Sequence, residues 1–184
     1  SEVLTKTNIS GLDIIPSDID LASAEVELVN TVGRETILKF NLEGMLGTYD
    51  YVLIDCPPSL GLLTLNALTV ANEIFVPLQT EFFALQGVSK LIQTFDVIKK
   101  RLNSKLEITG IIPCMYDSRT KLGQAVLDKI KEYFADKVFT TTIRKNIKLS
   151  ESTSHGMPIT SYAPDSNGAQ DYEALTKEII AQEK

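Results

Sequence analysis

Asp55 occupies the position that points most directly to chemistry. It follows four residues, 51–54, which are continuous and apolar, as expected for a strand covered on both faces of a parallel sheet. Such a strand places the carboxylate at the carboxyl edge of the sheet, where it can hold the water shell of a nucleotide-bound magnesium ion. Buried strands that end in Asp are also common, so this pattern by itself leaves both interpretations open.

The turn that follows this carboxylate is the second candidate. Pro57 and Pro58 cannot continue a helix or a central strand, and they make the backbone rigid. Ser59 is a favourable N-cap for a helix over residues 60–71, and Gly61 leaves the start of that helix open to close approach. A rigid loop beside a metal-binding carboxylate suits a segment that senses a γ-phosphate. The alternative is a simple turn with a capped helix.

Other site chemistries are restricted by composition. His155 is the one histidine, and Cys56 and Cys114 are the two cysteines, so His-rich zinc sites and disulfide frameworks are excluded. His155 falls in a loop, where we expect an exposed side chain without a catalytic role. No apolar run approaches the roughly 20 residues of a membrane span. Residues 1–10 are polar, which is not typical of a secretory signal, and a reducing cytoplasm is therefore expected.

Charge is distributed unevenly along the chain. The net charge of the 184 residues is −6, which by itself argues against a nucleic-acid partner. Residues 90–148, however, carry 13 basic against 6 acidic side chains, a net charge of +7, which leaves −13 for the remainder. This asymmetry can create a positive surface on an acidic protein, and the alternative is that the lysines lie on solvent-facing helices.

Short apolar runs alternate with longer amphipathic segments, which predicts one α/β domain over residues 1–184 with a mostly parallel sheet. Ligands of such sheets bind at the carboxyl ends of the strands, which is where the candidate carboxylate lies. The expected strands are residues 12–15, 51–54, 73–78, 106–114 and 137–143. The expected helices are residues 19–32, 35–45, 60–71, 83–102, 118–134, 148–152 and 169–182, with a loop over residues 154–168.

Eight blocks of sequence carry a family resemblance. They are residues 14–17, 21–22, 25–28, 49–61, 64–68, 76–81, 115–120 and 146–151. Together they resemble the ParA/Soj family of chromosome- and plasmid-partitioning ATPases. Several blocks in family-like order over nearly the whole chain are far more specific than any one motif. The resemblance implies a P-loop NTPase-like three-layer fold, a mostly parallel sheet flanked by helices, with its N-terminal strands missing here.

The resemblance also implies a nucleotide site that uses ATP and Mg²⁺ in the intact protein. Asp55 matches the Walker B aspartate, which is expected to orient magnesium through water and to take part in catalysis. Residues 57–61, which include Pro57 and Pro58, match the switch segment that follows it. Cys114 and Met115 close a strand near the place where the family holds adenine, although they could equally be core residues that finish a strand.

A second implication of the resemblance is sequence-independent binding of double-stranded DNA. Arg119 matches a basic position that the family uses for this purpose, as does Lys148, where relatives often carry arginine. Arg144 and Lys145 stand where relatives usually have Pro-Arg, so Lys145 joins the expected DNA-binding residues and Arg144 adds a positive charge. Binding of this kind relies on phosphate contacts and counterion release.

The family's activity implies further partners. ATP is expected to hold a homodimer together, and a ParB-type centromere-binding protein is expected to stimulate hydrolysis in the bacterial cytoplasm, at the nucleoid. One alternative is a non-catalytic module that binds DNA or a partner protein. Another is a MinD-like positioning ATPase, although residues 169–184 lack the basic amphipathic character of a membrane-targeting tail.

The phosphate-binding loop is the main departure from the family pattern. The 184 residues contain no G-x-x-x-x-G-K-[ST] sequence, and backbone amides and a lysine of that loop supply most of the grip on a triphosphate. We therefore expect the sequence to begin after this loop and to bind no ATP or Mg²⁺ by itself.

The first prediction follows from this departure. The purified 184-residue chain should show negligible Mg²⁺-dependent ATP hydrolysis, because Asp55 has no magnesium–phosphate complex to hold. Release of inorganic phosphate, measured with and without EDTA, checks this expectation. Hydrolysis that requires magnesium would refute it.

Overall fold

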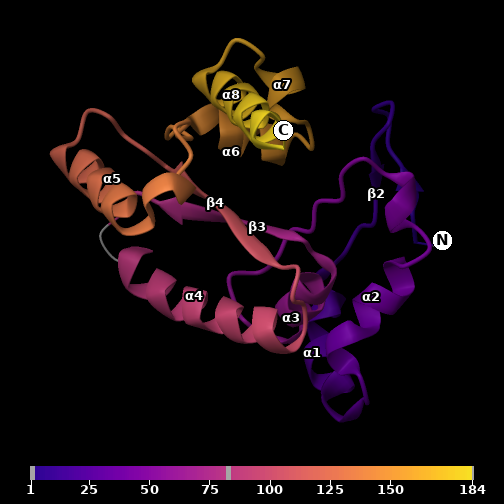
Figure 1. The fold of residues 1–184 in the computed structure, drawn as a ribbon. Coiled ribbons are helices and arrows are strands. Elements are labelled where there is room, and N and C mark those ends of the chain that lie inside the picture. The colour runs from indigo at the N-terminus through magenta and orange to yellow at the C-terminus, as the bar shows by residue number, and fades with distance from the viewer. Residues whose placement is uncertain (1–2, 82–83, 184) are drawn as a thin grey trace. The chain divides into compact units, whose positions relative to one another are not determined.

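A computed structural model describes residues 3–81 and 84–183 of the chain (Figure 1). It contains two compact units, Ser1–Ala71 and Asn72–Lys184. One domain over residues 1–184 stays a prediction.

The first unit has little regular structure. Strands β1 (Thr5–Lys6) and β2 (Asp13–Ile14) form an antiparallel pair. The helix expected over residues 19–32 is instead a 3-10 turn, helix α1 (Ala24–Glu27) and a second 3-10 turn. Ile19 and Val26 are 90% and 77% exposed, so no packed apolar face supports a continuous helix. The helix expected over residues 35–45 is present as a 3-10 turn followed by α2 (Ile37–Leu42).

The prediction of a strand over residues 51–54 is wrong for this structure. Residues 51–57 have neither helical nor strand geometry, and the Leu53 side chain is 88% exposed. An apolar run becomes a buried strand only when neighbouring strands take up its backbone N–H and C=O groups. Within the described residues the sheets are β1 with β2 and the pair of the second unit, and neither includes this run.

The second unit contains the α/β arrangement that the sequence predicts. Strands β3 (Glu73–Gln79) and β4 (Glu107–Cys114) are parallel, with a register irregularity between Ile74 and Phe75. Helix α4 (Ala84–Arg101) connects them, as a parallel pair requires. The bounds agree within one residue with the expected strands 73–78 and 106–114 and the expected helix 83–102; Phe83 lies outside the described residues.

Each face of this parallel pair has its own hydrophobic core. On one face Leu78 and Ile111 pack with Val126 and Ile130 of helix α5 (Lys121–Phe134). On the other face Ile112 packs with Phe139 and with Leu175 of helix α8 (Asn167–Gln182). Adjacent residues of β4 therefore point into opposite cores, and Figure 1 shows α4 and α8 on opposite sides of the strands. The second unit is thus built in three layers, as expected.

Residues 138–144 run along the free edge of β4 without becoming a regular strand. Phe139 and Ile143 donate backbone hydrogen bonds to Ile111 and Pro113 of β4, at 3.0 and 2.8 Å. Isolated parallel bridges join Val138 and Arg144 to this side of the unit. The strand predicted over residues 137–143 is therefore present as an extended segment in the expected place, with too few paired groups for a full ladder.

Three helices follow this segment. Helix α6 (Ile147–Ser154) covers the short helix predicted over residues 148–152. Helix α7 (Ile159–Tyr162) interrupts the predicted loop over residues 154–168. Helix α8 begins two residues before the predicted 169–182 because Ser166 accepts a hydrogen bond from the backbone N–H of Ala169 and caps it there. Helix α5 likewise begins at Lys121, because Thr120 caps it, and not at residue 118.

Gly110 provides a test of the close packing in this unit. A Cβ atom at this position would overlap the ring of Phe139, which is 1% exposed and cannot move aside. Gly110→Ala should lower the free energy of unfolding by about 1–3 kcal/mol, the usual cost of overpacking a core. Gly44→Ala is the matched control, since a Cβ there meets nothing within 4 Å. Urea unfolding of the two variants measures the difference, and equal stabilities would contradict the described packing.

Candidate functional site

Asp55 lies in the irregular segment of the first unit, and its side chain is exposed. The next residue, Cys56, is half-buried; burial, and then the nearby carboxylate of Asp55, raise the pKa of its thiol. Pro57 and Pro58 are exposed and lead into helix α3 (Leu62–Val70). The order carboxylate, rigid turn, helix is therefore as predicted, whereas the strand that was expected to carry Asp55 is not formed.

The N-terminus of α3 is stabilised by a residue that the sequence analysis did not select. Ser59 does not cap this helix, which corrects the prediction; its carbonyl accepts a 2.6 Å hydrogen bond from Thr64 Oγ1, and the N-cap residue is Gly61. The carboxylate of Glu25 accepts a 3.1 Å hydrogen bond from the N–H of Leu63. A negative charge at this end of a helix is favourable because it satisfies unpaired N–H groups.

The close approach expected at Gly61 is thus made by the protein itself. A Cβ atom at this position would collide with the carboxylate oxygens of Glu25. In this structure the open space beside the helix start therefore receives an acidic side chain of the same unit. No local pattern links Glu25 to Leu63, because 38 positions separate the two residues.

The residues around Asp55 do not by themselves fit a magnesium–nucleotide complex. Among residues 3–81 and 84–183, no group of three or more His, Cys, Asp or Glu side chains is placed to hold a metal ion. The chain also lacks a glycine-rich phosphate loop, and the carboxylate of Glu25 takes the N–H of Leu63 at the start of α3. One exposed carboxylate can supplement a phosphate-bound magnesium ion but cannot replace the phosphate grip.

Cys114 and Met115 lie in the second unit, at the carboxyl end of β4. Cys114 is the last residue of the strand and is half-buried, and burial raises the pKa of its thiol. Met115 has a φ of 55°, which is uncommon for a residue other than glycine, and its side chain is 46% exposed. The two residues therefore end the strand as predicted, and the chain leaves the sheet at Met115 through a left-handed turn.

Arg119 lies in the loop after this turn and is paired with Asp117. Its Nε and Nη2 atoms lie 2.9 and 2.7 Å from the two carboxylate oxygens, and its backbone N–H lies 3.0 Å from Oδ1. The hydrogen bonds from the guanidinium lower the pKa of Asp117 to about 2, with further contributions from the backbone N–H of Arg119 and the charge of Lys145. The Arg119 side chain is nevertheless 86% exposed, so it remains accessible to an anion.

Lys145 is brought to the same loop by backbone pairing. Its N–H donates to the carbonyl of Tyr116 at 3.0 Å, and the N–H of Tyr116 donates to Ile143 at 3.1 Å. Because Lys145 contributes to the low pKa of Asp117, its charge lies within the electrostatic reach of the Arg119 pair. The structure therefore brings together two of the three predicted DNA-binding cations.

Lys148 lies in the first turn of α6. Asn146 caps this helix, because its side chain accepts a 2.8 Å hydrogen bond from the backbone N–H of Lys148. The Lys148 ammonium lies 2.8 Å from Glu151, and Glu151 also accepts a 3.1 Å hydrogen bond from the hydroxyl of Tyr162. The hydrogen bond to Glu151 raises the pKa of Lys148. His155, exposed as expected, stacks on the ring of Tyr162.

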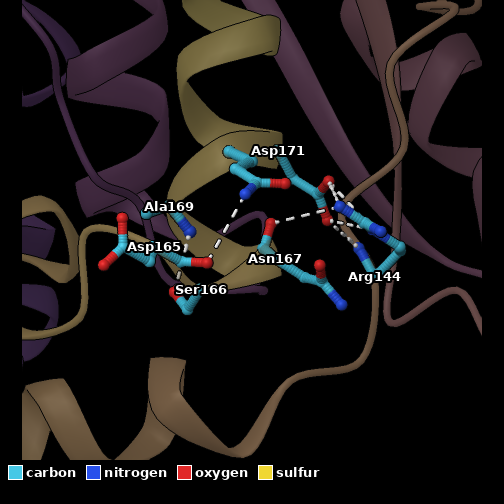
Figure 2. A network of polar contacts seen from close by, with 7 residues as sticks. Arg144, Asp165, Ser166, Asn167, Ala169 and Asp171 are labelled. Carbon is cyan, nitrogen blue, oxygen red and sulfur yellow. Dashed lines mark hydrogen bonds and ion pairs between the residues drawn. The ribbon is translucent and has the colours of Figure 1, made fainter.

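Sequence reasoning missed the partner of Arg144, which is Asp171 on α8. Figure 2 shows the guanidinium of Arg144 directed at this carboxylate, with Nη2 2.6 Å from Oδ1. The substitution of the family's usual proline by Arg144 was visible in the sequence. The partner was not, because it lies 27 residues further along the chain.

The chain is similar in sequence to a known domain family and to individual proteins. A family model described as an AAA domain matches residues 1–108. The chain is 48% identical to the sporulation initiation inhibitor protein Soj of Bacillus subtilis, covering 98% of the chain and 71% of that protein. It is 51% identical to the chromosome-partitioning ATPase Soj of Treponema pallidum, covering 100% and 72%. The chain belongs to the ParA/Soj family of partitioning ATPases.

Solved structures agree with the fold of this family. The chain superposes on a cobyrinic acid a,c-diamide synthase from Mycobacterium smegmatis, solved with a bound ATP analogue and magnesium, with a TM-score of 0.80 at 34% identity, covering 97% of the chain and 66% of that protein. The septum site-determining protein MinD of Pyrococcus horikoshii, complexed with Mg-ADP, gives 0.73 at 25% identity, covering 97% and 67%. The P-loop NTPase-like three-layer fold is therefore confirmed.

The chain covers 65% of another cobyrinic acid a,c-diamide synthase structure, so it spans about two thirds of the proteins that it matches. Of the described part of the chain, no helix is long and apolar enough to cross a membrane.

Proposed function

We propose that this chain is the greater part of an ATPase that segregates chromosomes or plasmids by cycling on and off DNA. The observation that carries the proposal is the 48–51% identity to two Soj proteins over essentially the whole chain. In the proposed cycle ATP binds at a homodimer interface, the dimer binds double-stranded DNA without sequence preference, and a ParB-type partner stimulates hydrolysis and release. The protein would act in the bacterial cytoplasm, at the nucleoid.

We propose Asp55 as the residue that orients the water shell of magnesium, with Pro57 and Pro58 as the rigid switch beside it. The charge chemistry supports this assignment, because an exposed carboxylate can order water around a metal that phosphate oxygens hold. Cys114 and Met115 are proposed to lie near adenine. The phosphate-binding residues are proposed to belong to the part of the relatives' length that the 184 residues do not span.

The proposed DNA-binding residues are Arg119, Lys145 and Lys148. All three side chains are exposed. Arg119 and Lys148 already have carboxylate partners, Asp117 and Glu151, so binding exchanges one anion for another. Such exposed pairs are weak in water, and a DNA phosphate can therefore compete for each cation.

Two other functions are less well supported. A MinD-like positioning ATPase shares the fold, but the identity of 25% to MinD is far below that to the Soj proteins. A non-catalytic module that binds DNA or a partner protein would need the basic residues but not Asp55. Hydrolysis and DNA binding are therefore tested separately.

Hydrolysis tests the role of Asp55. In the complete protein, with DNA and its partner present, Asp55→Asn should lower kcat by about 10- to 100-fold, the usual cost of removing a group that orients a metal's shell. Asp50→Asn is the matched control, since it removes the same charge from an exposed residue nearby. Equal rates for the two variants would contradict the proposed role.

DNA binding tests the role of the cations. Arg119→Ala and Lys148→Ala should each weaken binding to duplexes of unrelated sequence by a similar factor and lower the slope of log K against log salt by about one. Fluorescence anisotropy over a range of salt concentrations gives both quantities. Lys177→Ala is the control because it removes one exposed positive charge from α8. A slope unchanged in the first two variants would exclude phosphate contacts by these residues.

A further inference from the structure

Asp171 is a buried carboxylate that serves one segment of the chain. It is 7% exposed on helix α8. Arg144 gives it a bidentate contact, with Nε 3.0 Å from both oxygens and Nη2 2.6 Å from Oδ1. The backbone N–H of Arg144 also donates to Oδ2 at 2.9 Å. One carboxylate thus fixes both the side chain and the backbone of the same residue.

The residue that is fixed in this way stands between two parts of the proposed DNA-binding surface. Arg144 forms a parallel bridge with Tyr116, three residues before Arg119. The N–H of Lys145 donates to the carbonyl of Tyr116, and Asn146 then caps α6, on which Lys148 lies. The position of the backbone at Arg144 therefore decides where Lys145 and the start of α6 are placed.

A second acidic residue of α8 holds the earlier part of the same segment. Glu178, two helical turns after Asp171, accepts backbone hydrogen bonds from Thr140 and Thr141 at 2.7 and 2.9 Å. The N–H groups of Phe139 and Ile143 donate to β4. Those of Thr140, Thr141 and Arg144 donate instead to the carboxylates of Glu178 and Asp171. A side chain of α8 occupies the place of a neighbouring strand at both ends of the segment.

Arg144 itself is poorly placed to be a DNA ligand. Its guanidinium is committed to a carboxylate that is nearly inaccessible, and a further N–H lies 3.5 Å from the carbonyl of Asn167 (Figure 2). To bind a phosphate it would have to leave Asp171 buried and unpaired, which is unfavourable. The Arg144 side chain is 39% exposed, but its positive charge is paired with the buried Asp171.

We propose that Asp171, acting through Arg144, is a positioning residue for the DNA-binding cations Lys145 and Lys148. The inference rests on the proposed function and deepens it, since it assigns to α8 the role of holding residues 144–148 in position. It also gives two neighbouring basic residues different roles. Arg144 fixes the backbone through Asp171, whereas Lys145 contacts DNA phosphates.

The test compares variants of the complete protein in DNA binding. Asp171→Asn makes the protein one unit more positive, and Arg144→Lys keeps the charge but loses the fork of donors. Both should weaken binding to non-specific duplexes and lower the salt slope by about one to two, because Lys145 and Lys148 lose phosphate contacts. Glu173→Gln is the matched control, since it neutralises an exposed acid of the same helix and should bind at least as tightly as the wild type.

A direct contact between Arg144 and DNA predicts different effects of these two variants. If Arg144 contacted DNA directly, Asp171→Asn would free its guanidinium and strengthen binding, and Arg144→Lys would retain most of the affinity. Either result would overturn the inference.

Hydrogen exchange separates this inference from the proposed function. The amides of residues 143–149 should exchange faster in Asp171→Asn and in Arg144→Lys than in the wild type, while those of β4 remain protected. Unchanged exchange at residues 143–149 overturns the positioning role even if DNA binds. A wild-type protein that does not bind DNA overturns the proposed function, and the exchange data still decide whether Asp171 fixes the turn. If Asp171→Asn does not fold, Arg144→Lys provides both measurements.

Discussion

The hydrogen-bonded edges of β4 are the constraint on which the second unit depends. One edge forms the parallel ladder with β3, and the other receives the N–H groups of Phe139 and Ile143. Because adjacent residues of this strand point to opposite faces, its position also decides where both cores form. The loop that carries Arg119 begins where this strand ends, so the same pairing places the basic surface.

Local patterns predicted the apolar strands whose pairing partners are present among the described residues. The apolar runs of β3 and β4 were recognised from composition, and their bounds agree within a residue. The run at residues 51–54 has the same composition but no ladder in this structure. An apolar composition indicates that a segment can form a buried strand. It does not indicate whether the strands that must pair with it are present.

Contacts between distant residues account for most of the site that could not be predicted. Ser59 matches the residue preferences of an N-cap, yet Glu25 provides the stabilising carboxylate for α3. Asp171 and Glu178 are ordinary acidic residues of an amphipathic helix until their partners at residues 140–144 are known. By contrast, Arg119 and Lys148 were selected through family resemblance, and Asp55 was selected through its place after an apolar run together with that resemblance. Membership in the ParA/Soj family is now established, and the roles of these residues are proposals.

The carboxylates of α8 have a consequence for association between molecules. An extended segment at the border of a sheet normally offers unpaired N–H groups to any passing strand, which is how many proteins aggregate. Here Asp171 and Glu178 accept hydrogen bonds from Thr140, Thr141 and Arg144, and a charged group cannot extend a ladder. Carboxylates of α8 close this border in place of another strand, so these three N–H groups are not available to pair with a strand of a second molecule.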